Sequence, residues 1–345
     1  MNKIFPVVFL LALLLNACSS CSNKNKEKEF LPVIERKKMT DIYVPPIKIH
    51  RYEQDLFAIP LDSLKEKLTT LHKKYSFFYK LEDLNNPANI YQMKLYLTDP
   101  VVKQFKKDVD KQYNDLSWLE NSLKEAFKRI LYFDSSFVIP NIYTYVSGGD
   151  FEFPVKYAEN NLIIALDMYL GENYNIYKQF GIPKYISYRM TKDFIIVDCM
   201  KEIGRSYVEK YNPPNSTLLD KMLYHGKILY FTDIALPEIP DSTKIYYTTP
   251  QYMWASTNEG NVWGFFIDKK LLYTTDVREI NKYIGEAPFT STFSQNSAPR
   301  IGQYIGWQII RSYAQTHPNE NFKNIFSITN SSILLQQSGY KPKKN

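Results

Sequence analysis

The sequence feature that most constrains the fold is an apolar run in the middle of the chain, residues 194–200 (FIIVDCM). It belongs to a stretch of helical periodicity, residues 186–207, in which apolar side chains cover most of the circumference. Other elements must cover a helix that is apolar on nearly every side, so this helix is expected at the centre of a domain. Asp198 is the carboxylate within the run and lies toward the narrower polar side.

A second apolar helix is expected directly after Pro213 and Pro214. Thr217 and Asp220 have the spacing of a capping box, in which the two side chains satisfy backbone amides at the start of a helix. Pro237 marks the end of this helix, because a proline has no amide hydrogen to continue the hydrogen-bond ladder. The centre of the domain is therefore predicted to be a pair of packed helices.

The patterns elsewhere predict a mostly helical α+β fold. Further helices are expected over residues 61–71, 90–97, 101–113, 116–132, 249–266 and 300–314. Strands are expected within residues 47–51, 140–147 and 161–166, where apolar residues alternate with polar ones or form a short run. Such strands indicate a small sheet laid against helices. In the last helix Gly302 and Gly306 lie about one turn apart, which indicates close helix packing.

The first 17 residues have the pattern of a bacterial lipoprotein signal peptide. Lys3 precedes an apolar segment, residues 4–15, which is too short to span a membrane. Residues 15–18 (LNAC) resemble a lipoprotein box, which implies cleavage before Cys18 and acylation of that cysteine. Ser19 after the cysteine favours the outer membrane, on its periplasmic side. The alternative is an ordinary secretory signal with a chance cysteine.

A flexible tether (residues 18–44), one globular domain (residues 45–340) and a basic tail (residues 341–345) are expected to follow the signal peptide. The formal charge of +7 comes from the ends of the chain, since acidic and basic side chains balance over residues 39–340. Without a domain-wide basic field, nucleic-acid binding is not expected. Three cysteines, one of them acylated, do not indicate a disulfide framework.

Asp193, Asp198 and His225 are weak candidates for a metal site or a catalytic site. A single carboxylate without a second converging group performs no recognisable chemistry, so Asp198 is interpreted mainly as a hydrogen-bonded partner of a lysine or tyrosine. Asp193 follows Arg189 by four residues, which indicates a surface ion pair. His225 shares a stripe with apolar residues and is interpreted mainly as a core histidine. The alternative for all three is a ligand or acid role.

Catalytic motifs are absent from the sequence. No two histidines lie four residues apart, so the zinc motif H-E-x-x-H does not occur. The G-x-S-x-G elbow and the G-x-x-x-x-G-K-[ST] phosphate loop do not occur either. Catalytic residues and a cofactor are therefore not expected, and the protein is not predicted to be an enzyme.

Tyrosine is abundant, with 28 residues, many of them at apolar helical positions. A buried tyrosine needs a hydrogen-bond partner for its hydroxyl. A groove for peptide or glycan would use such hydroxyls, but an aromatic-rich core and surface is the preferred interpretation.

Eight segments, taken in order along the chain, resemble the gliding motility-associated lipoprotein family, GldB. They are residues 51–57 (RYEQDLF), 140–148 (PNIYTYVSG), 162–171 (LIIALDMYLG), 188–190 (YRM), 194–198 (FIIVD), 222–231 (MLYHGKILYF), 258–263 (NEGNVW) and 300–311 (RIGQYIGWQIIR). The resemblance implies a role in surface gliding and in the secretion machinery that accompanies it. Because the sequence also lacks a metal-ligand set, we predict a non-catalytic envelope lipoprotein that binds other envelope proteins.

The same layout is similar to a wider set of zincin-like peptidases, in which one helix carries H-E-x-x-H and the next carries a Glu-Gly ligand position. That resemblance places Asp193 and Val197 near the histidine positions and His225 near the glutamate. Valine cannot bind zinc, so the resemblance implies a degenerate peptidase scaffold without a metal. The alternative is an atypical metal-dependent hydrolase in the periplasm that uses His225, Asp198 and Asp193.

Overall fold

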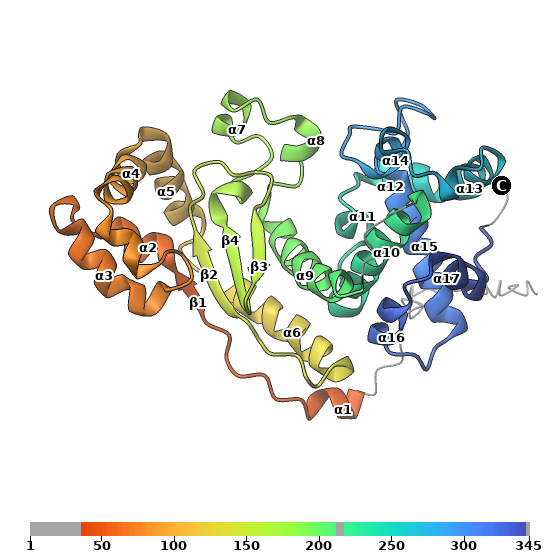
Figure 1. Cartoon of the computed structure of the whole chain (residues 1–345), viewed down its shortest axis with the longest axis horizontal. Coiled ribbons are helices and arrows are strands. Elements are labelled where there is room, and N and C mark those ends of the chain that lie inside the picture. Colours follow the sequence, from red (N-terminus) through yellow and green to blue (C-terminus); the bar gives the residue numbers. More distant parts are fainter. Residues whose placement is uncertain (1–35, 212–216, 343–345) are drawn as a thin grey trace, which may run out of the picture.

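A computed structural model describes residues 36–211 and 217–342. In these residues the fold is mostly helical with a small sheet, so the predicted α+β class is confirmed (Figure 1). Cys18, the signal peptide of residues 1–17 and the prolines at 213 and 214 lie outside the described residues.

Within the described residues the sheet has four strands in the order β1 (Ile49–Arg51), β2 (Asn141–Tyr145), β4 (Asn161–Ala165) and β3 (Val155–Ala158). β1, β2 and β4 are parallel, and β3 is antiparallel to β4. Every residue of β4 is buried, which explains its continuous apolar run. β3 was missing from the predicted strands. Glu159 and Asn160, both with positive φ, form the tight turn that joins β3 to β4.

One group of helices lies beside the β1–β2 side of the sheet (Figure 1). It comprises α2 (Tyr52–Phe57), α3 (Leu64–Tyr75), α4 (Pro87–Thr98) and α5 (Pro100–Gln112). α2, α3 and α4 enclose a small core of their own, which contains Tyr52, Leu56, Leu64, Leu68, Tyr75, Leu84 and Leu97. The buried residues of α5 belong to the large core instead. The predicted start of α5 is confirmed, because the Asp99 side chain accepts from the amides of Val101 and Val102.

The large core is built around α9 (Lys192–Glu209), α10 (Leu218–Ala235) and α15 (Ile301–Thr316). α6 (Ser117–Phe133) and the sheet contribute to the same core (Figure 1). The capping box of Thr217 and Asp220 is present at the start of α10, and α10 ends just before Pro237, as predicted.

The predicted helix over residues 186–207 is wrong at its N-terminal end. A one-turn helix, α8 (Lys184–Ser187), is followed by a break, and α9 begins at Lys192. The carbonyl of Met190 accepts a hydrogen bond from the amide of Gly171, at 2.9 Å, and Thr191 is extended. A tertiary hydrogen bond therefore replaces the helical one at this point.

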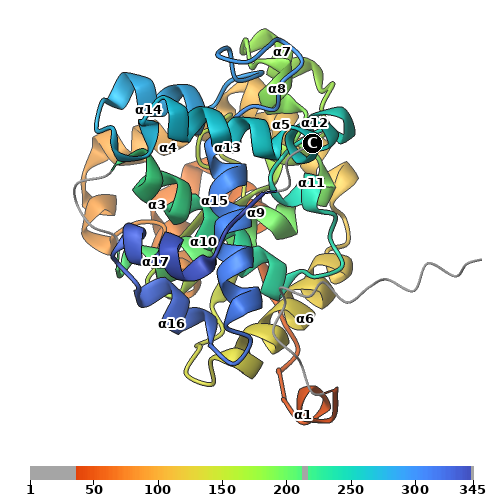
Figure 2. The same cartoon turned by 90° about the vertical axis from the view of Figure 1, so that its right-hand side faces the viewer.

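Shorter helices complete the described fold, most of them around α10 and α15 (Figure 2). They are α7 (Asn175–Gln179), α11 (Asp241–Lys244), α12 (Thr249–Thr257), α13 (Glu259–Asp268), α14 (Val277–Ile284), α16 (Phe322–Ser327) and α17 (Ser331–Ser338). The predicted helix over residues 249–266 is two helices, α12 and α13, which meet at Asn258. The break turns Glu259 toward Tyr304 and Tyr340, whose hydroxyls donate to its carboxylate at 3.1 and 2.8 Å.

The structured part begins before residue 45, where the predicted tether ends. α1 (Arg36–Thr40) lies beside α6, and Val44 is buried in the described structure (Figure 1). The end of the predicted tether, residues 36–44, therefore includes a short helix and a buried side chain. No helix in the described part of the chain is long and apolar enough to cross a membrane.

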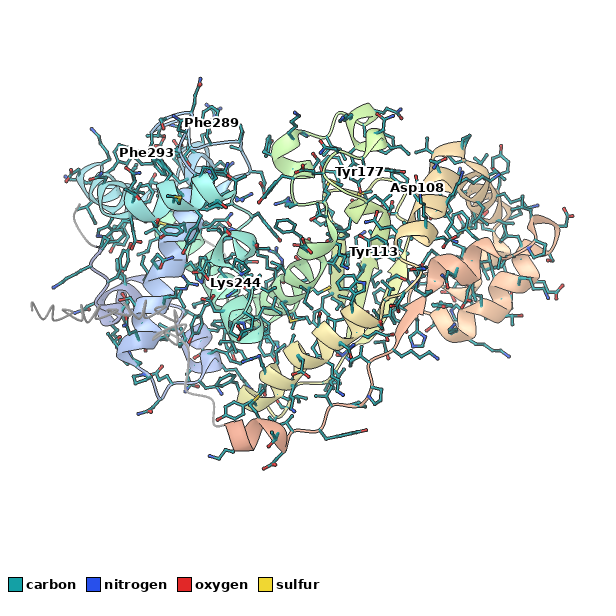
Figure 3. All side chains as sticks on the ribbon, turned by 180° about the vertical axis from the view of Figure 1, so that it is seen from behind. Asp108, Tyr113, Tyr177, Lys244, Phe289 and Phe293 are labelled. Atoms are coloured by element: carbon teal, nitrogen blue, oxygen red, sulfur yellow. The ribbon has the colours of Figure 1, made fainter. Side chains whose placement is uncertain are left out.

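Buried tyrosines join separate elements through their hydroxyls, as an aromatic-rich core requires. The Tyr113 hydroxyl, at the end of α5, donates to the carbonyl of Tyr169 at 2.5 Å. The Tyr177 hydroxyl of α7 donates to the carbonyl of Asp167 at 2.5 Å (Figure 3). Asp167 accepts from the amides of Ser147 and Gly148. These bonds attach the ends of β2 and β4 to the helices around them.

Candidate functional site

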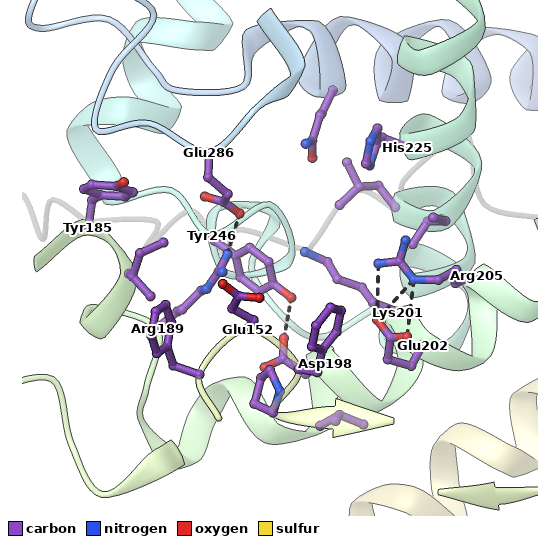
Figure 4. A pocket seen from close by; sticks show the side chains of 18 of the residues that line it. Glu152, Tyr185, Arg189, Asp198, Lys201, Glu202, Arg205, His225, Tyr246 and Glu286 are labelled. Carbon is purple, nitrogen blue, oxygen red and sulfur yellow. Dashed lines mark hydrogen bonds and ion pairs between the residues drawn. The ribbon is translucent and has the colours of Figure 1, made fainter. Parts of the chain in front are cut away.

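A cleft of about 840 Å³ lies along one face of α9 (Figure 4). Five charged residues of α9 line it: Asp198, Lys201, Glu202, Arg205 and Glu209. Their spacing of three and four residues places them on one stripe of an otherwise apolar helix. The opposite wall contains His225 of α10, Tyr246 after α11, Glu286 after α14 and Gln303 of α15. Phe151, Pro154, Pro183, Tyr185 and Ile186 line the remaining side.

Asp198 lies in the wall of the cleft and is 7% exposed. Its Oδ2 accepts from the Tyr169 hydroxyl at 2.5 Å, and its Oδ1 accepts from the Tyr246 hydroxyl. Burial raises the pKa of Asp198 above its usual value, while the two hydroxyls act in the opposite direction. The main interpretation of Asp198, a hydrogen-bonded partner of tyrosine, is confirmed.

The aromatic ring of Tyr246 lies close to three cations of the site. The Nζ of Lys201 lies 3.1 Å from the centroid of its ring, and the Cζ of Arg189 lies 4.7 Å from it. The Cζ of Arg300 lies 5.7 Å from the same ring. Tyr246 and Arg300 both have positive φ, of 59° and 49°, which costs energy for residues with a side chain. The fold therefore holds this aromatic ring among cations against the backbone preference.

Glu286 links two of these cations. Its carboxylate accepts from Arg189 at 2.9 Å and from Arg300 (Figure 4 shows the first pair). Burial alone would raise the pKa of Glu286, but Arg300 and Arg189 lower it below its usual value. The predicted ion pair of Arg189 with Asp193 is therefore wrong. Arg189 lies before α9 begins, so the helical spacing on which the prediction depended does not apply.

Lys201 points from α9 into the cleft (Figure 4). Among the described residues, no carboxylate oxygen lies within 4 Å of its Nζ and no side-chain hydrogen bond forms to it; its close contact is the Tyr246 ring. Burial lowers the pKa of Lys201 well below its usual value. The Asp198 carboxylate acts in the opposite direction, and the nearby Arg300 and Arg189 lower the pKa further. The next two charged residues on the stripe are paired, since Arg205 donates to Glu202 at 3.2 Å.

His225 faces the cleft from α10. Burial lowers its pKa to about 3, and the surrounding cations Arg205 and Lys201 contribute further. Its ring lies edge-on against the neighbouring Tyr224 ring, with 5.1 Å between centroids. His225 is therefore partly buried, and its imidazole forms part of the wall of the cleft.

The cleft contains two of the three weak site candidates. Asp198 and His225 lie on facing elements, whereas Asp193 is exposed and outside the cleft. Val197 is fully buried in the core. The two positions that the peptidase resemblance placed near zinc-binding histidines therefore do not face this cleft. Within the described residues, no three His, Cys, Asp or Glu side chains converge as a metal site would require.

Sequence reasoning missed most residues of the cleft. Lys201 and Arg205 could have been found, because they continue the polar stripe that Asp198 and Glu202 begin. Arg189, Tyr246 and Glu286 come from irregular segments, whose positions depend on tertiary packing, and they have no periodic signal.

Comparison with known proteins assigns the chain to a family. The model of the family described as gliding motility protein GldB matches residues 35–342, which include both central helices and the whole cleft. No curated protein and no solved structure matches the chain.

Proposed function

The chain belongs to the family of the gliding motility protein GldB, and from this membership we propose that it is a non-catalytic lipoprotein of the gliding machinery. It is attached to the cell envelope through acyl chains on Cys18, at the outer membrane and facing the periplasm. It acts by binding other proteins of the gliding machinery and the associated secretion machinery.

The observation that carries the non-catalytic part of the proposal is the state of the acids that line the inner cleft. Both oxygens of Asp198 accept from tyrosines, Glu202 pairs with Arg205, and Glu286 is shared by two arginines. These three carboxylates therefore serve as acceptors for donors of the fold itself. Cys199 does not supply a nucleophile, because it is fully buried and burial raises its thiol pKa well above the usual value.

The anchor is tested by membrane fractionation of cells that express the full chain. We expect the wild-type protein in the membrane fraction and the Cys18→Ser variant in the soluble envelope fraction. A variant that stays in the membrane fraction would contradict lipid attachment at Cys18.

The binding role is tested by capture from detergent-solubilised membranes with an affinity tag at the C-terminus. We expect the same gliding or secretion proteins in independent captures. An unrelated lipoprotein with the same signal peptide and tag controls for proteins captured through the lipid. If no such protein exceeds this control reproducibly, the proposal is wrong.

A second candidate function is that of an atypical metal-dependent hydrolase on a zincin-like scaffold. The favourable observation is that His225 is a neutral imidazole on the wall of the cleft that also contains Asp198. Elemental analysis of the purified protein decides this point. Stoichiometric zinc that is lost in His225→Ala would favour the hydrolase, and a protein that binds no added zinc would exclude it.

A further inference from the structure

The cleft contains a cation that the fold has not paired with an acid. The Lys201 ammonium contacts the face of the Tyr246 ring at 3.1 Å from the centroid, and no carboxylate among the described residues lies within 4 Å of it. A buried ammonium loses hydration free energy, and contact with an aromatic face replaces only part of it. An anion that enters the cleft could therefore reach a partly desolvated, unsatisfied charge.

The neighbouring acids do not neutralise this charge by direct contact. Asp198 is held by its two tyrosines, and Glu202 by Arg205. Glu286 accepts from both Arg189 and Arg300, so this group has one positive charge in excess. Glu152 and Glu209 also line the cleft, and the Glu209 carboxylate accepts from the Tyr224 hydroxyl at 3.2 Å.

His225 reports the local potential from the opposite wall. Beyond burial, the groups that lower its pKa are cations: Arg205, Lys201, Lys221 and Arg300. Two of these cations, Arg205 and Lys201, line the cleft together with His225, although the residues that line the whole cleft include more acids than bases.

We propose that this cleft binds a carboxylate group of a partner peptide, with the Lys201 ammonium as its charge partner. The proposal rests on the protein-binding function proposed above and names the chemistry of the bound segment. Burial favours the neutral form of Lys201, and a carboxylate bound beside it favours the charged form again. In that complex Lys201 supplies one charge and three donors, which matches one carboxylate. A phosphate is less suitable, because it needs several open donors and the nearby arginines already donate to Glu202 and Glu286.

The shape of the cleft favours a peptide over a small free acid. A volume of about 840 Å³ is much larger than a single carboxylate group needs. Phe151, Pro154, Pro183, Tyr185 and Ile186 form an apolar and aromatic side next to the charged stripe. Side chains that flank the carboxylate in a peptide could pack against this side while the carboxylate reaches Lys201.

The test is a calorimetric titration of the mature lipidated protein in detergent with three peptides. The first is N-acetyl-Ala-Ala-Ala with a free terminal carboxylate, and the second is N-acetyl-Ala-Glu-Ala-amide. The third, N-acetyl-Ala-Gln-Ala-amide, is the neutral control. We expect at least one carboxylate peptide to bind about tenfold or more tightly than the control. The first two peptides distinguish a chain terminus from an acidic side chain as the source of the carboxylate.

Two variants identify the residue responsible. Lys201→Gln should reduce binding of the carboxylate peptide to the level of the neutral peptide. Lys192→Gln is the matched control, because Lys192 is on the same helix, also contacts an aromatic ring (Trp118, 4.7 Å) and does not line the cleft. It should leave binding unchanged. Urea unfolding of both variants verifies that they are folded.

Three results would overturn the proposal. They are equal binding of the glutamate and glutamine peptides with none by the terminal carboxylate, unchanged binding in Lys201→Gln, and no saturable binding of either carboxylate peptide at millimolar concentration. None of these results affects the capture experiment. If the protein still captures gliding proteins, only the carboxylate proposal is wrong and the proposed function stands. If the protein binds carboxylate peptides but captures no gliding or secretion protein, the proposed function is wrong instead.

Discussion

The backbone carbonyl of Met222 in α10 occupies the place where a side chain on Gly306 of α15 would lie. The same holds in the other direction: a side chain on Gly226 of α10 would overlap the backbone of Gly306. α10 and α15 therefore approach each other backbone to backbone. The Gly302 and Gly306 spacing predicted close packing, and the structure confirms it.

Gly306→Ala should therefore destabilise the protein strongly. The added methyl group overlaps a backbone carbonyl, which cannot move like a flexible side chain, so we expect a loss of about 3 kcal/mol or more. The matched control is Gly264→Ala in α13, where no atom lies within 4 Å of the added methyl group. This control should gain up to about 1 kcal/mol from helix propensity. Similar urea midpoints for the two variants would contradict the close crossing.

The two tyrosines that hold Asp198 should each contribute to stability. Tyr169→Phe or Tyr246→Phe removes one hydroxyl that donates to a buried carboxylate, and we expect a loss of about 1.5 to 3 kcal/mol for each. The pKa of Asp198 should also rise further, because the hydroxyls favour its charged form. Tyr91→Phe, at a site 60% exposed, is the control and should be close to neutral. Carbon NMR titration of Asp198 would show no rise if the hydroxyls did not donate to it.

His225 should make the protein less stable in acid. Its pKa is about 3 in the folded chain and about 6.5 when unfolded, so below pH 6.5 the unfolded chain binds a proton that the folded chain does not. The free energy of unfolding that depends on neutral His225 is at its full value above pH 6.5 and decreases as the pH falls toward 3. Urea unfolding between pH 4 and 8 should show a shallower decline for His225→Gln, by roughly 1 kcal/mol per pH unit at most. His72→Gln, outside the cleft, should keep the decline because His225 remains. Equal slopes in His225→Gln and the wild type would refute this origin.

The central elements could be predicted because their signals are local. Thr217 and Asp220 form the start of α10 through side chains three residues apart, and Pro237 follows its end. β3 was missed because four residues with one alternation do not form a pattern. The break before α9 was missed because it depends on a hydrogen bond between Gly171 and Met190, which are distant in sequence. Neither proline nor glycine marks that break.

The cleft could be predicted only in part, for the same physical reason. Asp198 was identified as the one carboxylate of an apolar run, and Lys201 continues its stripe one turn later. Its role as an unpaired cation, however, requires Tyr246 and Glu286 to be in place. Those residues are brought there by loops after α11 and α14, and Arg300 reaches the carbonyls of Ile245 and Tyr246 from a backbone with positive φ. Such convergence has no signature along the chain.

A buried charge cluster between α10, α11 and α15 provides the last prediction. Asp233 accepts from Lys244, from Arg311 and from the Trp307 indole, all at 2.8 Å. Asp241 also pairs with Arg311, at 2.8 Å, so two carboxylates balance two cations away from water. Removing one charge leaves the others uncompensated in a medium of low polarity.

We therefore expect Asp233→Asn to cost about 3 to 5 kcal/mol, because it leaves two buried cations with one carboxylate. Lys244→Met should also destabilise the protein, since it leaves two buried carboxylates with one cation. The double variant restores neutrality, so its loss should be smaller than the sum of the single losses, by about 0.5 to 3 kcal/mol. A double-mutant cycle from urea unfolding measures this coupling directly. Additive losses would mean that the side chains contribute by packing alone, and that charge balance at Asp233 does not hold the three helices together.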